Sequence, residues 1–166
     1  MTDTVTRELA SPNLASLVER GGVYHDVPGT NPKELLAAVI NGLPPIPSLD
    51  TSELYREILE REALVSTGIG RGIALPHPRN PMIGEDGEPF VAVVFPAQPL
   101  EWSTPDGIKV HTVLLIVSSS TKQHLGTLSK INFLCQQEEF YTLIKGRASE
   151  EVIVAAIQKA ETKWKE

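Results

Sequence analysis

The chain has 166 residues, a length that suits one domain rather than two. Its 15 Lys and Arg residues against 21 Asp and Glu residues give a formal net charge of −6, and the basic residues do not cluster. Nucleic-acid-binding domains usually carry a basic face, so we expect no nucleic-acid partner. The single cysteine excludes an internal disulfide. Neither a signal peptide nor an apolar run of the ~20 residues needed for a membrane span is present, so we expect a cytoplasmic protein with no direct membrane insertion.

The first third of the chain predicts a short strand and helices with clear caps. Residues 1–20 are expected to form a loose polar lead-in with a short helix over residues 12–19, and residues 23–27 a strand. Asn31, followed by Pro32, is placed to cap a helix that Gly42 ends. A second helix is expected to begin at Asp50 and to run to about residue 63.

The middle of the chain changes in character. Residues 66–76 form a glycine-rich turn that leads into a short apolar strand over residues 73–75. A polar loop over residues 80–89 separates this strand from a second one at residues 90–95. Residues 109–117 are the longest strand candidate. Apolar runs of this kind indicate a sheet that is covered on both faces.

The last third is helical. Ser120 or Thr121 is placed to cap one helix, a second is expected over residues 138–145, and Ser149 is placed to cap the last. The predicted order is a strand, two helices, three strands and three helices. This order predicts a single α/β domain over residues 1–166, a three-layer sandwich with helices on both faces of a small mixed sheet.

His77 is the first candidate for chemistry. It follows the predicted strand of residues 73–75 and lies between Pro76 and Pro78, which restrict the backbone around it. Because histidine titrates near neutral pH, a ring held rigidly at the end of a buried strand is suited to proton or group transfer. A surface histidine in a rigid turn fits the same local features.

The glycine-rich turn also has two interpretations. Gly68, Gly70 and Gly72 do not have the spacing of a dinucleotide-binding loop, and a strand rather than a helix follows them. Successive N–H groups in such a turn can form an anion-binding concavity. A tight turn with positive φ explains the glycines equally well.

The remaining candidates are weaker. His124 lies in the first turn of a predicted helix, where it could neighbour a bound phosphate or be only an exposed residue. His111 alternates within an apolar strand and is expected in the core, and Cys135 falls on the apolar face of a helix. No metal-ligand spacing and no nucleophile elbow occurs, so we expect no metal and no serine-hydrolase chemistry.

Two motifs together resemble a known family. The first is Arg61-Glu62 followed by residues 66–77, which read Ser-Thr-Gly-Ile-Gly-Arg-Gly-Ile-Ala-Leu-Pro-His, and the second is His124-Leu125-x-x-Leu128. They resemble the fructose/mannitol-type enzyme IIA (EIIA type 2) of the bacterial phosphoenolpyruvate-dependent phosphotransferase system, which includes the nitrogen-regulatory IIA proteins. The resemblance covers roughly residues 28–159. It departs from the family at Pro78, where a small residue is common.

The resemblance implies a fold and a set of site residues. The fold would be the α/β/α sandwich of the phosphotransferase/anion transport protein type. His77 would be the phosphorylated residue, with His124 and Arg61 beside it. Phosphate-binding groups would come from the glycine-rich turn: Ser66, Thr67, Gly68 and Gly70.

The resemblance also implies partners. An HPr-like phosphocarrier protein would donate a phosphoryl group to His77, with no cofactor or metal. The acceptor would be a separate IIB protein in sugar transport or a regulated target protein in nitrogen regulation. The segment Leu100-x-x-x-x-x-Asp106-Gly107-x-x-Val110 is similar to the nitrogen-regulatory members, so we favour that role. Sugar transport stays open as the alternative, as does a domain that only binds partners.

Overall fold

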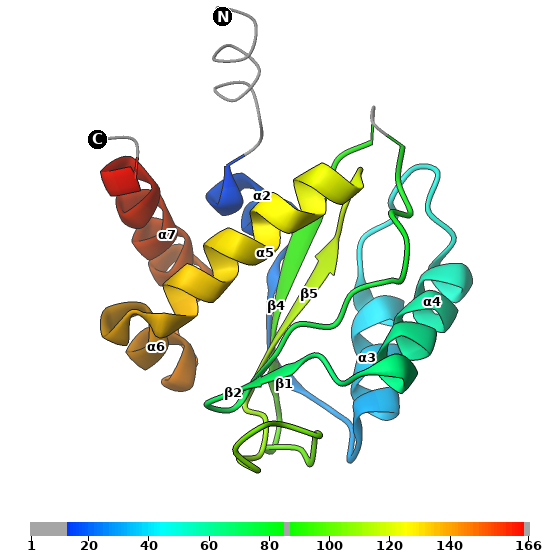
Figure 1. Cartoon of the computed structure of the whole chain (residues 1–166), viewed down its shortest axis with the longest axis horizontal. Helices are drawn as coiled ribbons and strands as arrows, with labels where there is room; N and C mark the ends of the chain where they lie inside the picture. Colours follow the sequence, from blue (N-terminus) through cyan, green and yellow to red (C-terminus); the bar gives the residue numbers. More distant parts are fainter. Residues whose placement is uncertain (1–12, 85–86, 165–166) are drawn as a thin grey trace, which may run out of the picture.

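The computed structural model describes residues 13–84 and 87–164. A five-stranded mixed sheet lies between two layers of helices (Figure 1). The elements in chain order are α2 (Leu14–Gly21), β1 (Val23–Val27), α3 (Pro32–Gly42), α4 (Thr51–Leu64), β2 (Gly68–Gly70), β3 (Ile73–Ala74), β4 (Phe90–Pro96), β5 (Thr112–Val117), α5 (Thr121–Gln136), α6 (Glu138–Lys145) and α7 (Glu150–Trp164).

The sheet has the order β1-β4-β5-β3-β2. Strand β4 runs parallel to β1 and antiparallel to β5, while β3 runs parallel to β5 and antiparallel to β2. Every residue of β4 and β5 is buried. Helices α3 and α4 cover one face, and α2, α5, α6 and α7 cover the other (Figure 1). The predicted α/β sandwich on a small mixed sheet is therefore confirmed.

Side-chain caps begin three of the helices where the sequence predicts them. The Asn31 side chain accepts a hydrogen bond from the Glu34 amide at 2.9 Å, and Asp50 accepts from the Ser52 amide at 2.9 Å. Ser120 rather than Thr121 caps α5, because its hydroxyl accepts from the Gln123 amide at 3.1 Å. Each cap satisfies an amide of the first turn that has no partner within its own helix.

The helix predicted within the N-terminal lead-in is confirmed. It was expected over residues 12–19, and α2 spans Leu14–Gly21. The helix thus continues past its predicted end at residue 19. Leu14 and Leu17 are buried on its inner face, so α2 is part of the core. Residues 1–12, which include the predicted first residue of this helix, lie outside the described residues.

The glycine-rich turn holds a strand that the sequence analysis missed. Gly68–Gly70 pairs antiparallel with Ile73–Ala74, which adds β2 to the predicted strands. Arg71 and Gly72 reverse the chain between the two strands with φ values of 56° and 79°. Glycine adopts such angles without steric cost, which allows a hairpin this short. The strand predicted over residues 109–117 begins only at Thr112.

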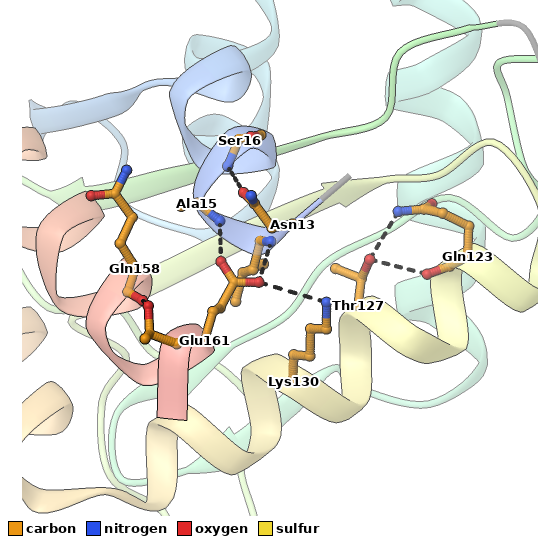
Figure 2. A network of polar contacts seen from close by, with 10 residues as sticks. Asn13, Ala15, Ser16, Gln123, Thr127, Lys130, Gln158 and Glu161 are labelled. Atoms are coloured by element: carbon orange, nitrogen blue, oxygen red, sulfur yellow. Dashed lines mark hydrogen bonds and ion pairs between the residues drawn. The ribbon is translucent and has the colours of Figure 1, made fainter. Parts of the chain in front are cut away.

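A buried carboxylate joins the two ends of the described chain. Glu161 of α7 is only 6% exposed. Its side chain accepts hydrogen bonds from the Leu14 and Ala15 amides at 2.9 and 3.0 Å, and Lys130 Nζ lies 3.6 Å away (Figure 2). The negative charge lies at the amide end of α2, where the helix dipole favours it. Among the described residues, no helix combines the length and apolar character of a membrane span.

Replacing this carboxylate tests how much it contributes. In Glu161→Ala, two buried amides of α2 lose their acceptor, so we expect the free energy of unfolding to fall by about 2 kcal/mol. Urea unfolding followed by circular dichroism measures it. Glu151→Ala, which removes an exposed carboxylate from the same helix, is the matched control. An equal decrease in the free energy of unfolding in the two variants would show that Glu161 does not stabilise α2.

Candidate functional site

Backbone pairing places His77 beside the end of β5. The Ile116 amide donates a hydrogen bond to the Pro76 carbonyl at 3.0 Å, which extends the contact between β3 and β5 to the residue before His77. Since the two strands are parallel, their carboxyl ends meet at one edge of the sheet. His77 and Ser118 leave the sheet there, and α5 begins just after Ser118.

The His77 ring is fixed in one tautomer. Its Nδ1 lies 2.8 Å from the carbonyl oxygen of Leu75. A carbonyl only accepts hydrogen bonds, so Nδ1 carries the hydrogen and, in the neutral ring, Nε2 carries a free lone pair. Burial lowers the pKa of His77 below 6.5, and the positive charge of Arg61 adds to this, while the Leu75 carbonyl and Glu62 partly offset it. The ring is therefore a neutral nucleophile at pH 7.

His124 lies against His77. The two ring centroids are 4.6 Å apart, with an angle of 50° between the ring planes. His124 belongs to the first turn of α5, and its Nδ1 is 3.1 Å from the hydroxyl of Ser118. Burial lowers the pKa of His124 to about 4, with smaller effects from His77 when that ring is protonated and from the positive charge of Arg61. His124 is thus also neutral at pH 7.

A small cavity opens between these histidines. Its volume is about 110 Å³, and it is lined by both rings, by Ser118 and Thr121, and by residues 78–81 of the following loop. A water molecule takes up about 30 Å³ of liquid, so the cavity has room for a small anion. The first turn of α5 faces it, and helix starts favour negative charge. Pro78, the departure from the family pattern, is buried in its wall.

Arg61 adds a positive charge to the site. It lies in the last turn of α4, and its Nη1 donates to the Val65 carbonyl at 2.6 Å. Its charge contributes to the lowered pKa of both His77 and His124. Of the three predicted catalytic residues, the structure brings the rings of His77 and His124 together, whereas Arg61 does not line the cavity and its described hydrogen bond is to the Val65 carbonyl.

The neighbouring Glu62 joins α4 to the hairpin that leads to His77. Its carboxylate accepts hydrogen bonds from the amide and the hydroxyl of Thr67, and from Trp102 Nε1 at 3.4 Å. The Thr67 carbonyl in turn accepts from the Leu75 amide at 3.0 Å. Since the Leu75 carbonyl orients His77, an unbroken chain of hydrogen bonds runs from α4 to the imidazole ring.

The four residues predicted to bind phosphate lie along this hairpin. The Ser66 hydroxyl donates to the Ser103 carbonyl and accepts from the Gly68 amide, and the Thr67 hydroxyl donates to Glu62. Gly68 pairs with Ala74 near the site, whereas Gly70 pairs with Ile73 at the distant turn. Both predicted hydroxyl groups are thus already engaged in internal contacts.

One amide of the distant turn binds a carboxylate of the protein itself. Asp106 Oδ2 accepts a hydrogen bond from the Arg71 amide at 2.7 Å, and Oδ1 accepts from the Ile108 amide at 3.1 Å. These backbone hydrogen bonds lower the pKa of Asp106. The positive φ values of Gly70 and Gly72 agree with the tight-turn interpretation, and a concavity of successive amides that binds an anion stays a prediction.

The other histidines and the cysteine lie elsewhere. His111 is half-buried rather than in the core, and its Nε2 lies 3.0 Å from the Arg71 carbonyl at the hairpin turn. His25 lies against the Arg147 and Ala148 carbonyls. Cys135 is buried, which raises its pKa to about 12. Within residues 13–84 and 87–164, no group of three or more His, Cys, Asp or Glu side chains could hold a metal ion.

Comparison with known proteins identifies the family. Residues 17–160 match the family described as "Phosphoenolpyruvate-dependent sugar phosphotransferase system, EIIA 2". The chain belongs to this family. A nitrogen regulatory protein of Pseudomonas aeruginosa is 31% identical over 121 residues, which cover 71% of this chain and 77% of that protein.

Solved structures share the fold of this EIIA chain. The nitrogen regulatory protein IIA-Ntr of Neisseria meningitidis superposes with a TM-score of 0.71 at 21% identity, covering 86% of this chain and 97% of that one. Enzyme IIAMtl of Escherichia coli, solved in complex with phosphorylated enzyme IIBMtl, superposes with a TM-score of 0.57 at 14% identity. The match covers 74% of this chain and 83% of that one.

Two residues of the site in this EIIA chain carry little signal in the sequence. Glu62 belongs to the motif with Arg61, and its position at the end of a helix beside the glycine-rich turn is the one indication that it joins the two. For Ser118, the signal is a run of three serines directly after an apolar strand.

Titration of the two site histidines tests the electrostatics of this EIIA chain. We expect the ring protons of His124 to titrate near pH 4 in NMR spectra and those of His77 below pH 6.5, assigned with His77→Gln and His124→Gln. Unfolding restores ordinary pKa values, so below pH 6.5 the unfolded chain binds more protons and stability decreases as the pH is lowered toward 4. A His124 midpoint near 6.5 would contradict burial as the cause.

Proposed function

We propose that this chain carries a phosphoryl group on His77 Nε2, received from an HPr-like phosphocarrier protein in the phosphotransferase system. The observation that carries this proposal is the hydrogen bond from His77 Nδ1 to the Leu75 carbonyl. It leaves the Nε2 lone pair of a neutral ring available as the nucleophile. The ring lines a cavity of about 110 Å³, which has room for a phosphoryl group. The family to which the chain belongs supports the same assignment.

The transfer is a substitution at phosphorus. The Nε2 lone pair of His77 forms the new N–P bond while the P–N bond to the histidine of the donor breaks, and the donor ring keeps that electron pair. The His77 ring becomes positively charged, with the Nδ1 hydrogen still bonded to the Leu75 carbonyl. A hydrogen bond from a charged donor is stronger, so this contact stabilises the phosphorylated ring.

The negative charge of the phosphoryl group needs local donors. The site offers the guanidinium of Arg61, the ring of His124 and the first turn of α5. Because phosphoryl transfer passes through a loose, in-line transition state, the protein acts mainly by positioning such groups. Ser66, Thr67 and Gly68 support the site by holding the hairpin in place. For Gly70, the proposed contact with phosphate has the least support, since it lies at the distant turn.

The phosphorylation site can be tested directly. With phosphoenolpyruvate, enzyme I and HPr, the intact mass of the protein should increase by one phosphoryl group, and the adduct should be labile in acid. We expect no adduct in His77→Gln, because the nucleophile is lost. His25→Gln, which changes an exposed histidine outside the site, is the control and should behave like the wild type. An adduct that survives in His77→Gln would refute this assignment.

We further propose a nitrogen-regulatory role, in which a target protein in the cytoplasm senses the phosphorylation state of His77. The supporting observation is the 31% identity to a nitrogen regulatory protein over most of both chains. The alternative is a fructose/mannitol-type enzyme IIA that passes phosphate to a separate IIB protein. The complex of IIAMtl with phosphorylated IIBMtl is the structural precedent for that alternative.

Transfer to IIB separates the two roles. The phosphorylated protein is mixed with purified IIB proteins of the fructose and mannitol systems, and the phosphoryl group is followed by intact mass. A sugar-specific IIA is tested in parallel. If this protein is a regulator, we expect its phosphoryl group to stay on His77 under conditions in which the sugar-specific IIA transfers its own phosphoryl group completely. Transfer at a rate comparable to that of the sugar-specific IIA would favour the transport role instead.

A further inference from the structure

Ser118 is a buried hydroxyl with one described contact. It follows the last residue of β5 and is 3% exposed. Its Oγ lies 3.1 Å from His124 Nδ1, and no other hydrogen-bond partner of this Oγ is found among residues 13–84 and 87–164. The His124 side chain and Ser118 both line the cavity that holds the His77 ring.

Counting hydrogens decides which of the two groups donates. A hydroxyl has one hydrogen to donate, and a neutral imidazole has one N–H group. If the ring hydrogen were on Nδ1 of His124, Ser118 would accept it, and its own hydrogen would have no described acceptor at a buried position. Leaving a buried donor unpaired is unfavourable. Ser118 donating to Nδ1 satisfies the more buried of the two groups, and the ring hydrogen then lies on Nε2 of the partly exposed His124, where no acceptor is found within residues 13–84 and 87–164.

We infer that Ser118 is a positioning residue, which keeps the ring hydrogen of His124 on Nε2 so that His124 presents an N–H donor to the phosphoryl group on His77. The second half of this inference rests on the proposed function. His77 and His124 then have opposite tautomers, since a backbone carbonyl holds the hydrogen of His77 on Nδ1. One ring presents a lone pair at Nε2 and the other presents a donor.

Because His124 is neutral, the choice of ring nitrogen that carries its hydrogen affects the site. A protonated imidazole has two N–H groups and donates from both nitrogens. Burial keeps His124 neutral at pH 7, so it has a single hydrogen, and in the wrong tautomer an Nε2 lone pair would face the phosphoryl oxygens. A donor that is already oriented needs no rearrangement during the transfer. Removing the Ser118 hydroxyl should therefore slow phosphoryl transfer by about tenfold, the effect of one lost hydrogen bond.

The tautomer can be measured without phosphate. In protein labelled with nitrogen-15 in its histidines, long-range NMR correlations distinguish a protonated from an unprotonated ring nitrogen. At pH 7 we expect His124 to be protonated on Nε2 and His77 on Nδ1. A hydrogen on Nδ1 of His124 in the wild-type protein would overturn the inference. Because this experiment uses the unmodified wild type, it is decisive even if a variant fails to fold.

The effect on transfer needs matched variants. Ser118→Ala should be phosphorylated by HPr about tenfold more slowly and should show mixed tautomers of His124. Ser118→Thr, which keeps a hydroxyl, should restore both. Ser119→Ala removes the neighbouring hydroxyl, which makes no described hydrogen bond, and should match the wild type. Equal rates for Ser118→Ala and wild type, with both folded, would overturn the positioning role.

The two proposals fail in different ways. If the wild type takes no phosphoryl group from HPr, the proposed function is wrong, and so is the phosphate-facing part of the inference about Ser118. The tautomer of His124 is decided independently by NMR. If the wild type is phosphorylated on His77 but His124 carries its hydrogen on Nδ1, only the inference about Ser118 is wrong.

Discussion

The site depends on the hydrogen bond that joins the Ile116 amide to the Pro76 carbonyl. It extends the contact between two parallel strands to the residue before His77, so that His77 and Ser118 leave the sheet side by side. Helix α5 begins three residues after Ser118, at Thr121, and its first turn places the His124 ring against that of His77. Without this contact, the short strand β3 would not fix the position of the residues that follow it. The chemistry of the site thus depends on backbone pairing at the edge of the sheet.

Local charge in the site opposes the charge of the whole protein. The chain has a net charge of −6, and a phosphoryl group adds about 1.5 to 2 further negative charges near neutral pH. The site nevertheless places the positive end of α5 next to two neutral imidazoles, and the charge of Arg61 lowers the pKa of both. Nearby donors outweigh distant charges because solvent and salt screen the latter over about 8 Å at physiological ionic strength. An acidic protein can therefore hold an anion.

The sequence predicts those parts of the structure that short-range interactions determine. Caps such as Asn31 and Ser120 bind amides within one helical turn, so the neighbouring residues are sufficient to predict where the helix begins. The hairpin was missed because Gly68–Gly70 has few side chains to form a recognisable strand pattern. Similarly, Asp106, whose carboxylate binds the Arg71 amide, is 35 residues away from Arg71, and no local pattern connects them. Local features are enough to single out His77 and His124, whereas the roles of Arg61 and of the glycine-rich turn follow only from the family resemblance, and the contact between the two rings requires the structure.

Two carboxylates fix the two ends of the hairpin that leads to His77. Glu62 accepts hydrogen bonds from Thr67 and Trp102 at one end, and Asp106 accepts from the Arg71 amide at the distant turn. The hairpin donors that these carboxylates bind are therefore paired within the protein. The hairpin acts on His77 through its backbone instead, since the Thr67 carbonyl accepts from the Leu75 amide and the Leu75 carbonyl orients the His77 ring.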